Sequence, residues 1–532
     1  MSRKLLLVYP KSPPPCYLEM GAVAPLVRRS SLLLHASLPT VAALTPPEFE
    51  VRIIDENLET IDYDVPYDVV GISCHHYHSG PAREIAERFR ARGALVVCGG
   101  PVVSVTPEKF RGFSDVLIIG EAERTWPKFL QDYLHGRHER VYEETERFDL
   151  SISPVPDYSG FAPSTLKQYM SGIVQTSRGC PYDCEYCAAI TYLGRKVRRK
   201  PIDTVVAELE QLHALGFRYV WLVDDNFSAG RREAKALLRA IRTWNRGKRH
   251  PMGLSAALSL ETARDTEFLA LAAEAGLTRV SIGIGSPDEA SLQEANKVQN
   301  LRRDIKADVK AFHQHGILVS GGCMVGFDAD DLSIFQRQLD FFTEIGVAEV
   351  RVYPVQALEG TRLKDRMAAE GRWHDWDRAA EIGRSLAGAH FVPSLFNVVT
   401  FDPRNMTAEQ LRQGSLWLLA QFNRLEAHVG RLQTFFHNFE HSPVKDKLAI
   451  PHGPPTLEDL GMAARVLRSA WAEADRVERQ ALRTLLSTAR RSSHPQKFSF
   501  VIGALLAVKN NRAMLDAHGV DVARIRNPAC AA

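Results

Sequence analysis

The sequence predicts an α/β protein in three parts: a doubly wound, Rossmann-like N-terminal domain, a partial (β/α)6 barrel and a C-terminal helical domain. Two observations support this prediction. Short apolar stretches alternate with amphipathic helical stretches through residue 395, and the pattern is helical from there to the end. The alternation favours parallel sheets, because consecutive parallel strands need a crossover helix between them.

The composition is that of an ordinary globular protein. The 532 residues are 45% hydrophobic and 24% charged, which excludes a disordered, collagen-like or coiled-coil chain. The net charge is only +3, so charge gives no argument for a nucleic-acid partner. No apolar run is long enough to span a bilayer, and the first apolar stretch is too short for a signal peptide. Eight cysteines are too few for a disulfide scaffold, so we expect a reducing, cytoplasmic setting.

Residues 1–140 are predicted to form the doubly wound domain. Five continuous apolar stretches suit parallel strands that are covered on both faces. They are Lys4–Pro10, Glu50–Asn57, Asp68–Cys74, Ala94–Gly100 and Asp115–Gly120, with a helix over Pro81–Arg92. A ligand of this domain should lie at the carboxyl ends of the strands. Residues 141–170 are rich in Pro and Ser, which predicts a linker.

Residues 171–395 are predicted to form the barrel. The expected strands are Ile173–Thr176, Tyr219–Asp224, Leu254–Leu258, Arg279–Ile284, Leu318–Val325 and Glu349–Val355. Helices fall between them, for example Pro201–Leu215 and Arg231–Trp244. Six units indicate a partial barrel, with catalytic groups on the loops that follow the strands. Residues 396–532 form the helical domain, in which Thr407 is a capping residue at a helix start.

A cysteine array carries the chemical signal. Cys180, Cys184 and Cys187 form a C-x-x-x-C-x-x-C motif directly after a predicted strand. Thiolates are the soft ligands of iron–sulfur and zinc sites, and a structural zinc site takes four ligands. Here the local count stops at three, which would leave one iron of a four-iron cluster open. A zinc knuckle completed from elsewhere is the alternative, and it would make the chain a zinc-stabilised binding module.

The array, with Tyr186 before its last cysteine, resembles that of the radical S-adenosylmethionine (SAM) enzymes. The strings VWLVDDNFS, VSIGIGSPDEASLQEANKVQN, GGCMVGFD and ALEGTRLKDRMAAEGR are similar in order and spacing to one subgroup of that family. Members of this subgroup, such as the hopanoid methylases, have an N-terminal cobalamin-binding-type domain and a C-terminal helical extension. VVGISC, VVCGGP and LIIGEAERTW are similar to that N-terminal domain.

The resemblance implies three cofactors: a [4Fe–4S] cluster on the three cysteines, SAM at the open iron, and cobalamin. It implies a C-methyltransferase that attacks an unactivated carbon through a 5′-deoxyadenosyl radical. The alternative keeps the radical chemistry without cobalamin, as in a cyclase, an oxidase or a carbon–carbon bond former with a vestigial N-terminal domain. The expected partners are a small-molecule or lipid substrate and an electron donor such as flavodoxin or ferredoxin.

The resemblance also assigns residues to SAM. The set is Tyr186, Asp224, Asp225, Asn226, Gly283, Ser286 and Gly322. A carboxylate after the second barrel strand would meet the ammonium group of SAM, and a capped strand-end turn is the alternative for these residues. Gly322 would let the backbone approach the adenosine. The chain has Gly285 where relatives often have Glu.

For cobalamin the resemblance assigns residues at strand ends of the N-terminal domain. The set is Ser73, His75, His76, Gly99, Gly100, Gly120 and Glu121. The chain has no D-x-H-x-x-G string, which implies that no protein histidine binds the cobalt. The HHYH string at 75–78 is bulky for a surface that receives a corrin. It could bind a metal, donate to a substrate, block the corrin or form a solvated loop.

Two further features bear on the substrate. Cys323, Tyr353 and Gln356 are candidates for substrate contacts, although a small core residue is the favoured interpretation of Cys323. The stretch KFSFVIGALLAVK in the last part of the chain has an apolar run between two lysines. A buried core helix is the favoured interpretation, and a helix that touches a membrane surface is the alternative.

Overall fold

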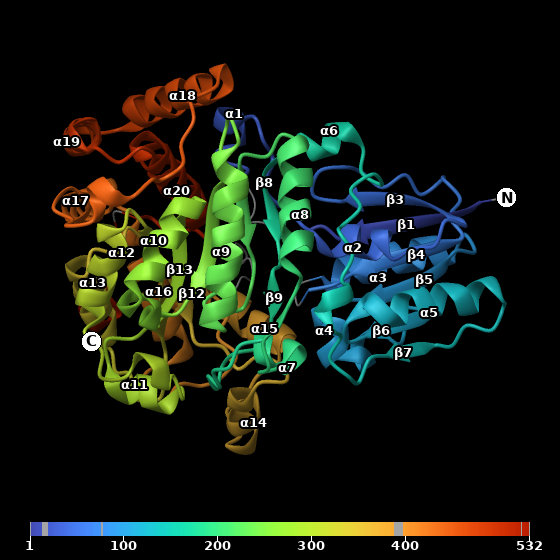
Figure 1. Ribbon diagram of the computed structural model, residues 1–532. Coiled ribbons are helices and arrows are strands. Elements are labelled where there is room, and N and C mark those ends of the chain that lie inside the picture. Colours follow the sequence, from blue (N-terminus) through green and yellow to red (C-terminus); the bar gives the residue numbers. More distant parts are fainter. Residues whose placement is uncertain (1, 13–19, 76–77, 388–396, 523, 531–532) are drawn as a thin grey trace. The chain divides into compact units, whose positions relative to one another are not determined.

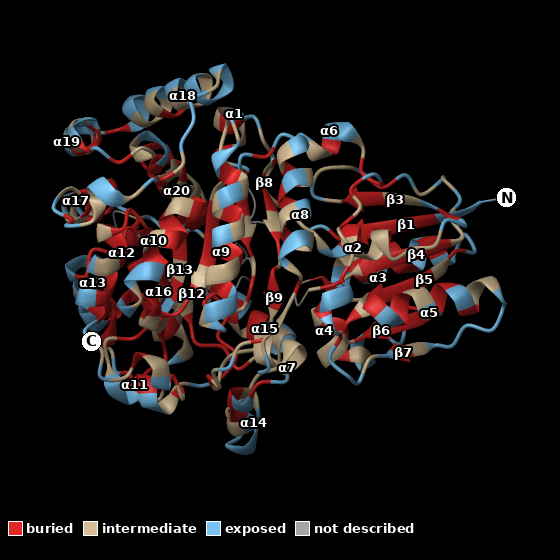
Figure 2. Cartoon of the chain, in the orientation of Figure 1, coloured by how far each residue is buried: buried red, intermediate tan, exposed pale blue. Residues whose placement is uncertain are grey.

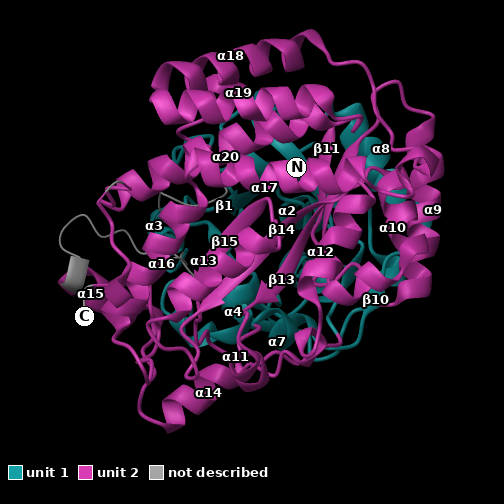
Figure 3. Cartoon of the chain, turned by 90° about the vertical axis from the view of Figure 1, so that its left-hand side faces the viewer, with its two compact units in different colours: residues 1–19, 29–180, 188–217 teal, residues 20–28, 181–187, 218–532 magenta. Residues whose placement is uncertain are grey.

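The computed structural model describes residues 2–12, 20–75, 78–387, 397–522 and 524–530 (Figure 1). The chain folds as two compact units (Figure 3). Unit 1 consists of Met1–Glu19, Arg29–Cys180 and Ala188–Phe217, and unit 2 consists of Met20–Arg28, Pro181–Cys187 and Arg218–Ala532. Strands alternate with helices in both units, which confirms the predicted α/β class.

Unit 1 contains a six-stranded parallel sheet. Its strands, in spatial order, are β3 (Phe49–Asp55), β1 (Arg3–Tyr9), β4 (Val69–Ser73), β5 (Leu95–Gly99), β6 (Val116–Ile119) and β7 (Val141–Glu143). The five predicted strands are all present, and β7 lies in the stretch predicted as a linker. Because β1 pairs with β3 on one side and β4 on the other, the winding of the sheet reverses between β1 and β4. This reversal is where an open α/β sheet presents its ligand site.

Helices cover both faces of this sheet, as predicted for a doubly wound domain. On one face Val70 and Ile72 belong to a core that includes Phe89 of α3 (Ser79–Arg90). On the other face Gly71 lies against Trp126 of α5 (Ala122–Leu134), where an added Cβ would come within 3.3 Å of the indole. In Figure 2 the central parts of β4 and β5 are coloured as buried, in line with their burial patterns. Alternate strand residues thus serve opposite faces.

Unit 1 also contains the first strand of the barrel series, β8 (Tyr169–Val174), which pairs in parallel with β2 (Ser31–Leu34). Helix α8 (Ile202–Ala214) packs on β8 where Gly172 leaves room for Leu212. The short strands β9 (Ser177–Arg178) and β10 (Arg198–Arg199) form an antiparallel pair beside α7 (Ala189–Leu193). The sequence predicted β8 a few residues too late and did not predict β2.

Unit 2 contains the other five predicted barrel strands. They are β11 (Tyr219–Leu222), β12 (Gly253–Leu258), β13 (Leu277–Gly285), β14 (Leu318–Val325) and β15 (Glu349–Pro354), paired in parallel in sequence order. Helices α9 (Arg231–Arg246), α10 (Thr266–Ala275), α12 (Ile305–Gln314) and α13 (Ile334–Glu344) follow the first four of these strands. With β8, the six β/α units of the predicted partial barrel are present.

The end of the chain is helical, as predicted. Its helices are α16 (Ala408–Phe422), α17 (Leu425–Glu440), α18 (Leu457–Glu473), α19 (Arg476–Arg491) and α20 (Lys497–Ala517). Thr407 caps α16 by accepting a hydrogen bond from the backbone N–H of Gln410. The apolar run of α20 is buried, with Leu505 only 4% exposed, so the core interpretation of this helix holds. No helix among the described residues has the length and apolarity needed to cross a membrane.

Candidate functional site

The cysteine loop, residues 180–187, follows β9. Gly179 has a φ of +96°, and a Cβ there would lie 2.5 Å from the carbonyl oxygen of Lys196, so the turn into the loop requires glycine. The Cys180 N–H donates to the carbonyl oxygen of Gly194 at 3.3 Å. Cys184 is buried, and Cys180 and Cys187 are half-buried.

These thiols are not arranged around a single point. In the described part of the chain, no three His, Cys, Asp or Glu side chains converge as the ligands of one metal ion do. In a four-iron cluster each cysteine binds a different iron, so its ligands are spread around the cluster. The chemistry of the donor set, three thiols on one short loop, fits such a cluster.

A second segment of unit 2 forms hydrogen bonds with the cysteine loop. Residues 295–300, called the bracket below, follow α11 (Glu289–Glu294). The Glu185 N–H donates to the carbonyl oxygen of Ala295 at 2.9 Å, and Gln299 Nε2 lies 3.5 Å from Cys184 Sγ. At its other end the bracket bonds to β13, because Asn300 Nδ2 donates to the carbonyl oxygens of Gly283 and Ile284 at 3.0 and 2.7 Å. The bracket therefore links the cysteine loop to the carboxyl end of β13.

Arginines neutralise the acidic side chains of the loop. Arg366 of α14 (Arg362–Ala369) donates to both carboxylate oxygens of Glu185, at 2.8 and 3.0 Å, and also bonds to Asp328 at 2.9 Å. Arg362 Nη2 lies 3.3 Å from a carboxylate oxygen of Asp183. The hydrogen bonds that Arg366 donates to Glu185 are the largest cause of the raised pKa of Arg366. The carboxylates that flank the cysteines thus have their own counter-charges.

Two neighbouring glycines form a surface without side chains on β13 and β14, called the glycine floor below. Gly283 is exposed although Ile282 and Ile284 on either side of it are buried. A Cβ at Gly322 would meet only the backbone of β13, 3.7 Å from Gly283 Cα, so no described side chain lies within 4 Å of that position. Glycines here let a ligand approach the backbone closely. Tyr353 on β15 is half-buried between buried neighbours and lies on the same pleat as Gly322, given the pairing of the two strands.

Lys297 of the bracket lies beside this floor, and our sequence reasoning did not select it. It is 6% exposed, and Tyr186 is among the groups whose charge acts on its ammonium. Its Nζ is 3.3 Å from where a Cβ of Gly283 would lie, and its Cδ is 3.3 Å from the corresponding position at Gly285. Burial lowers the pKa of Lys297, but the Tyr186 hydroxyl and the Cys184 and Cys187 thiols together hold it above its ordinary value. A lone lysine in a helical stretch gives no sequence signal for such a place.

The residues after β11 divide between two roles. Asp224 is 3% exposed and Asp225 is half-buried. Asn226 Nδ2 donates to Ser259 Oγ at 3.3 Å, and its Oδ1 accepts from Ser228 Oγ at 2.7 Å. Asn226 therefore joins the ends of β11 and β12, which matches the strand-end turn proposed as the alternative. The buried carboxylate of Asp224 stays the candidate for the ammonium of SAM.

Three other predicted residues lie in the protein interior. Ser286 is fully buried, and its Oγ accepts from the N–H of Asp288 at 3.1 Å, so it shapes the entry to α11. Cys323 is 0% exposed on the pleat opposite Gly322, and burial raises the pKa of its thiol. Gln356 is buried, with Nε2 donating to the carbonyl oxygen of Val398. The core interpretation of Cys323 is thereby favoured, and of the substrate candidates Tyr353 alone shares the glycine floor's pleat.

In unit 1 the predicted cobalamin residues line the carboxyl edge of the six-stranded sheet. Ser73 and Gly99 are register partners at the ends of β4 and β5, and both are half-exposed. Gly100 has a φ of +106°, and a Cβ there would lie 2.7 Å from the carbonyl oxygen of Cys74. Gly120 has a φ of +85° and is similarly close to the carbonyl oxygen of Glu144. The fold itself therefore requires Gly100 and Gly120, whether or not a ligand approaches.

The structure describes only His75 and His78 of the HHYH string, because His76 and Tyr77 lie outside the described residues. His78 is 4% exposed, and its Nδ1 accepts from the N–H of His75 at 3.3 Å. Its Nε2 lies 3.3 Å from Ser12 Oγ, so His78 bridges the segments that follow β4 and β1 at the winding reversal. Burial is the main cause that lowers the pKa of His78 to about 3, which keeps the ring neutral. The solvated-loop interpretation is wrong for His78.

Glu121 was predicted to contact cobalamin, but its carboxylate is committed to a buried ion cluster. One oxygen accepts from Arg178 at 3.0 Å, and the other accepts from Arg198 and from the N–H of Phe148 at 2.7 and 2.6 Å. Arg178 also bonds to Glu123 at 2.5 Å. Arg178 is the last residue of β9, directly before the cysteine turn. Glu121 therefore anchors the strand that leads to Cys180, because both of its oxygens are already used.

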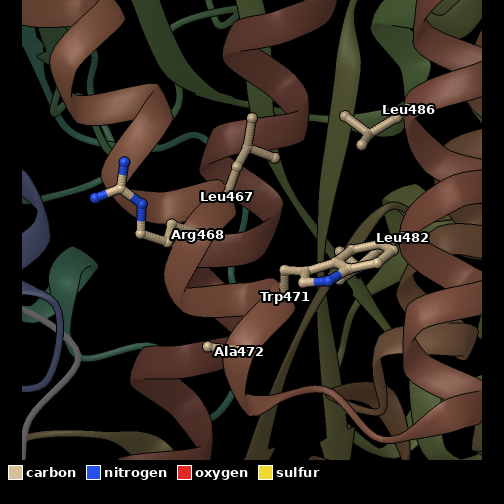
Figure 4. A pocket seen from close by; sticks show the side chains of 6 residues that line it. All are labelled: Leu467, Arg468, Trp471, Ala472, Leu482 and Leu486. Atoms are coloured by element: carbon tan, nitrogen blue, oxygen red, sulfur yellow. The ribbon is translucent and has the colours of Figure 1, made fainter.

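A groove of about 390 Å³ lies between α18 and α19, and Figure 4 shows the side chains that line it. It is lined by Leu467, Arg468, Trp471, Ala472, Leu482 and Leu486. The guanidinium of Arg468 and the indole N–H are the polar groups of its lining side chains. The groove thus lacks the acid, base and thiol groups that a reaction of the predicted kind would need, and it contains no predicted site residue.

Comparisons with known proteins agree on one superfamily. The family model described as the Radical SAM superfamily matches residues 174–340. An uncharacterized methyltransferase of Synechocystis is 32% identical over 377 residues, which cover 70% of this chain and 69% of the relative. The hopanoid C-2 methylase of Rhodopseudomonas palustris is 29% identical over 395 residues, covering 72% of this chain and 73% of that enzyme.

A solved structure extends the likeness to almost the whole chain. The radical S-adenosylmethionine methyltransferase TsrM of Kitasatospora setae, with cobalamin and a [4Fe–4S] cluster bound, matches with a TM-score of 0.59. The match covers 91% of this chain and 100% of TsrM at 18% identity. At that identity the comparison establishes the shared fold, including the N-terminal and C-terminal parts outside residues 174–340.

Proposed function

The chain belongs to the radical SAM superfamily, and from that premise we propose that it is a cobalamin-dependent C-methyltransferase acting on an unactivated carbon. The observation that carries the proposal is the attachment of the cysteine loop, through the bracket, to the end of β13 beside the glycine floor. This arrangement puts thiol ligands and an accessible backbone surface in one part of unit 2. The named methyltransferases among its relatives support the reaction class.

Cys180, Cys184 and Cys187 would hold the cluster. Among the described residues the buried Oε1 of Gln299 has no hydrogen-bond partner, while its Nε2 lies 3.5 Å from Cys184 Sγ, as suits a side chain that lines a ligand-filled space. When bound, the cluster and SAM supply a 5′-deoxyadenosyl radical, and cobalamin supplies the methyl group. Asp224 would accept a hydrogen bond from the ammonium group of SAM, and Gly283 and Gly322 would admit its nucleoside to the backbone.

Cobalamin would lie along the carboxyl edge of the six-stranded sheet. Ser73, Gly99 and Gly100 offer half-exposed backbone and a hydroxyl there, which fits the tail of a bulky ligand. His78 is held by Ser12 and by the backbone of His75, so we expect its ring to stay off the cobalt. Glu121 would affect cobalamin binding only indirectly, through the strand β9 that it anchors.

The substrate class that we propose is a small organic molecule, a lipid included, with Tyr353 as its candidate contact. The one-electron donor would be a low-potential protein such as flavodoxin or ferredoxin. A reducing, cytoplasmic setting suits the exposed side of a thiolate-bound cluster.

The test is the wild-type chain purified without oxygen, reconstituted with iron, sulfide and hydroxocobalamin, and given SAM and a reductant. Formation of 5′-deoxyadenosine, together with retained cobalamin and transfer of a labelled methyl group to an added substrate candidate, supports the proposal. Formation of 5′-deoxyadenosine without retained cobalamin would overturn the methyltransferase assignment and leave a cobalamin-independent radical enzyme.

A further inference from the structure

Lys297 is a buried cation whose counter-charge is not a carboxylate. In the part of the chain that the structure describes, no ion pair joins it to Asp or Glu, and its Nζ lies 3.3 Å from where a Cβ of Gly283 would be. A buried ammonium is unfavourable unless an anion faces it. The bracket places Lys297 beside the cysteine loop, since Gln299, two residues further on, has its Nε2 3.5 Å from Cys184 Sγ, and the charges of the Cys184 and Cys187 sulfurs act on the ammonium. These sulfurs are negative when they bind metal, so the charge of Lys297 is balanced in the cluster-bound protein.

The position of the ammonium is fixed on two sides. The stem of Lys297 crosses Gly285, where a Cβ would come within 3.3 Å of Cδ and 3.5 Å of Cε. The bracket that carries it is bonded to the loop, because Asn296 Nδ2 donates to the carbonyl oxygen of Asp183 at 2.8 Å. A side chain at 285 would displace Lys297, and the glycine there gives it room. The Lys297 ammonium is therefore fixed in position, unlike the ammonium of a mobile surface lysine.

The acidic residues of the cysteine loop have counter-charges other than Lys297. Glu185 and Asp183, the acidic residues of the loop, are paired with Arg366 and Arg362. Lys297 is therefore not required to neutralise them.

We propose that Lys297 is a positioning residue whose fixed positive charge stabilises the reduced form of the iron–sulfur cluster and so raises its reduction potential. The inference rests on the proposed function, because it requires the cluster. A cluster held by thiolates is negatively charged and gains one more negative charge when an external one-electron donor reduces it. A nearby held cation favours the more negative form, and this preference is strongest where water is excluded.

The experiment is a redox titration of the reconstituted protein followed by EPR, in the absence of SAM, with iron and thermal unfolding measured on each variant. In Lys297→Met the equilibrium constant for one-electron reduction should fall at least tenfold, a shift of about 59 mV to more negative potential. Lys297→Arg, which keeps the charge, should stay close to wild type. Lys306→Met is the matched control, since Lys306 is 60% exposed on α12 and its charge is screened by water.

Each outcome decides the inference. Iron-loaded Lys297→Met with the wild-type potential would overturn it, as would a variant that loses only affinity for SAM, since Lys297 would then serve that ligand. If Lys297→Met binds no iron, Lys297→Arg decides: bound iron there supports the need for charge, and its loss in both variants overturns the proposal in favour of packing. A wild-type chain that binds no iron refutes the proposed function itself, which is a separate result.

Discussion

Single residues set the chemistry of the cysteine loop. Gly179 sets the turn into it through its positive φ, and Gly283 and Gly322 keep one surface free of side chains. Cys184 is buried, whereas Cys323 serves the core despite its position in a motif string. Identical residue types thus have different roles, which depend on the pleat or turn that each occupies.

Replacement of Cys180, Cys184 or Cys187 with Ala should lower bound iron strongly and abolish formation of 5′-deoxyadenosine. Each cysteine would supply one of the three protein ligands proposed for the cluster. Iron analysis and chromatography of the reaction products measure both effects. The exposed Cys530→Ala is the control and should match wild type. Product formation by the triple variant would refute the cluster assignment.

Asp224→Ala should weaken SAM binding while the cluster stays loaded. Loss of a charge-assisted hydrogen bond removes about 1.5–3 kcal/mol, which is tenfold or more in affinity. Equilibrium binding of SAM to the reconstituted protein measures the change, and iron content shows whether the site is intact. Asp225→Ala, at the half-buried neighbour, should have the smaller effect. Unchanged affinity in Asp224→Ala would assign the contact to another residue of this turn.

At the scale of elements, the loop before α5 and the strand β9 are joined by buried charges. Glu121 and Glu123 lie at the start of α5, and Arg178 ends β9. The Glu121 and Arg178 side chains are 5% and 13% exposed. An ion cluster of this kind defines the place of β9, and with it the start of the cysteine turn, more sharply than apolar contacts would.

Glu121→Gln should destabilise the fold by about 3–5 kcal/mol at neutral pH, because the buried Arg198 guanidinium loses its anion and Arg178 keeps only Glu123. Burial acts to raise the pKa of Glu121, but the bond from Arg198 and the charge of Arg178 hold it below its usual value. A lowered pKa in the folded state means that this stabilisation is present above the usual carboxyl pKa. It is lost as the pH falls through the lowered value.

Urea unfolding across a pH series tests this prediction. Wild type should lose stability on acidification, and Glu121→Gln should lose less. Glu146→Gln, at an 82% exposed carboxylate, is the control and should lie within about 0.5 kcal/mol of wild type at neutral pH. Equal stability of Glu121→Gln and wild type at neutral pH would mean that the ion cluster does not stabilise the fold.

At the scale of the whole molecule, the chain forms two compact units where the sequence predicted three parts, and the strand order of each sheet indicates its ligand edge. The six-stranded sheet of unit 1 reverses its winding between β1 and β4, beside Ser73 and Gly99. In unit 2 the parallel series β11–β15 puts the SAM candidates at strand ends. Each edge is where an α/β sheet presents its ligand.

The chain should retain hydroxocobalamin after anaerobic reconstitution, with no protein histidine on the cobalt. The EPR spectrum of the Co(II) form should lack nitrogen splitting from a protein ligand, because His78 is buried, neutral and engaged with Ser12. His75→Ala should leave the spectrum unchanged. Loss of a nitrogen splitting in that variant, or failure to retain cobalamin, would contradict the assignment.

Much of the fold was predictable because strand and helix patterns are local. Continuous apolar stretches predicted eleven strands that the structure contains, and Thr407 was recognised as a helix cap. The short strands β2 and β7 were not predicted, because a few residues at a sheet edge carry little pattern of their own. The buried state of α20 was favoured from its apolar run and is confirmed.

The sequence by itself determined the fold class and the superfamily and predicted the cysteine ligands, because these depend on periodicity and on residues close together in the chain. Tertiary structure decided which polar residues act on the site. Glu121 is drawn into an ion cluster by Arg178 and Arg198, and Lys297 is carried to Cys184 and Cys187 by the bracket. Charge pairing and the direction of each side chain from its strand are set by packing between residues far apart in the sequence. Local sequence patterns therefore do not predict them.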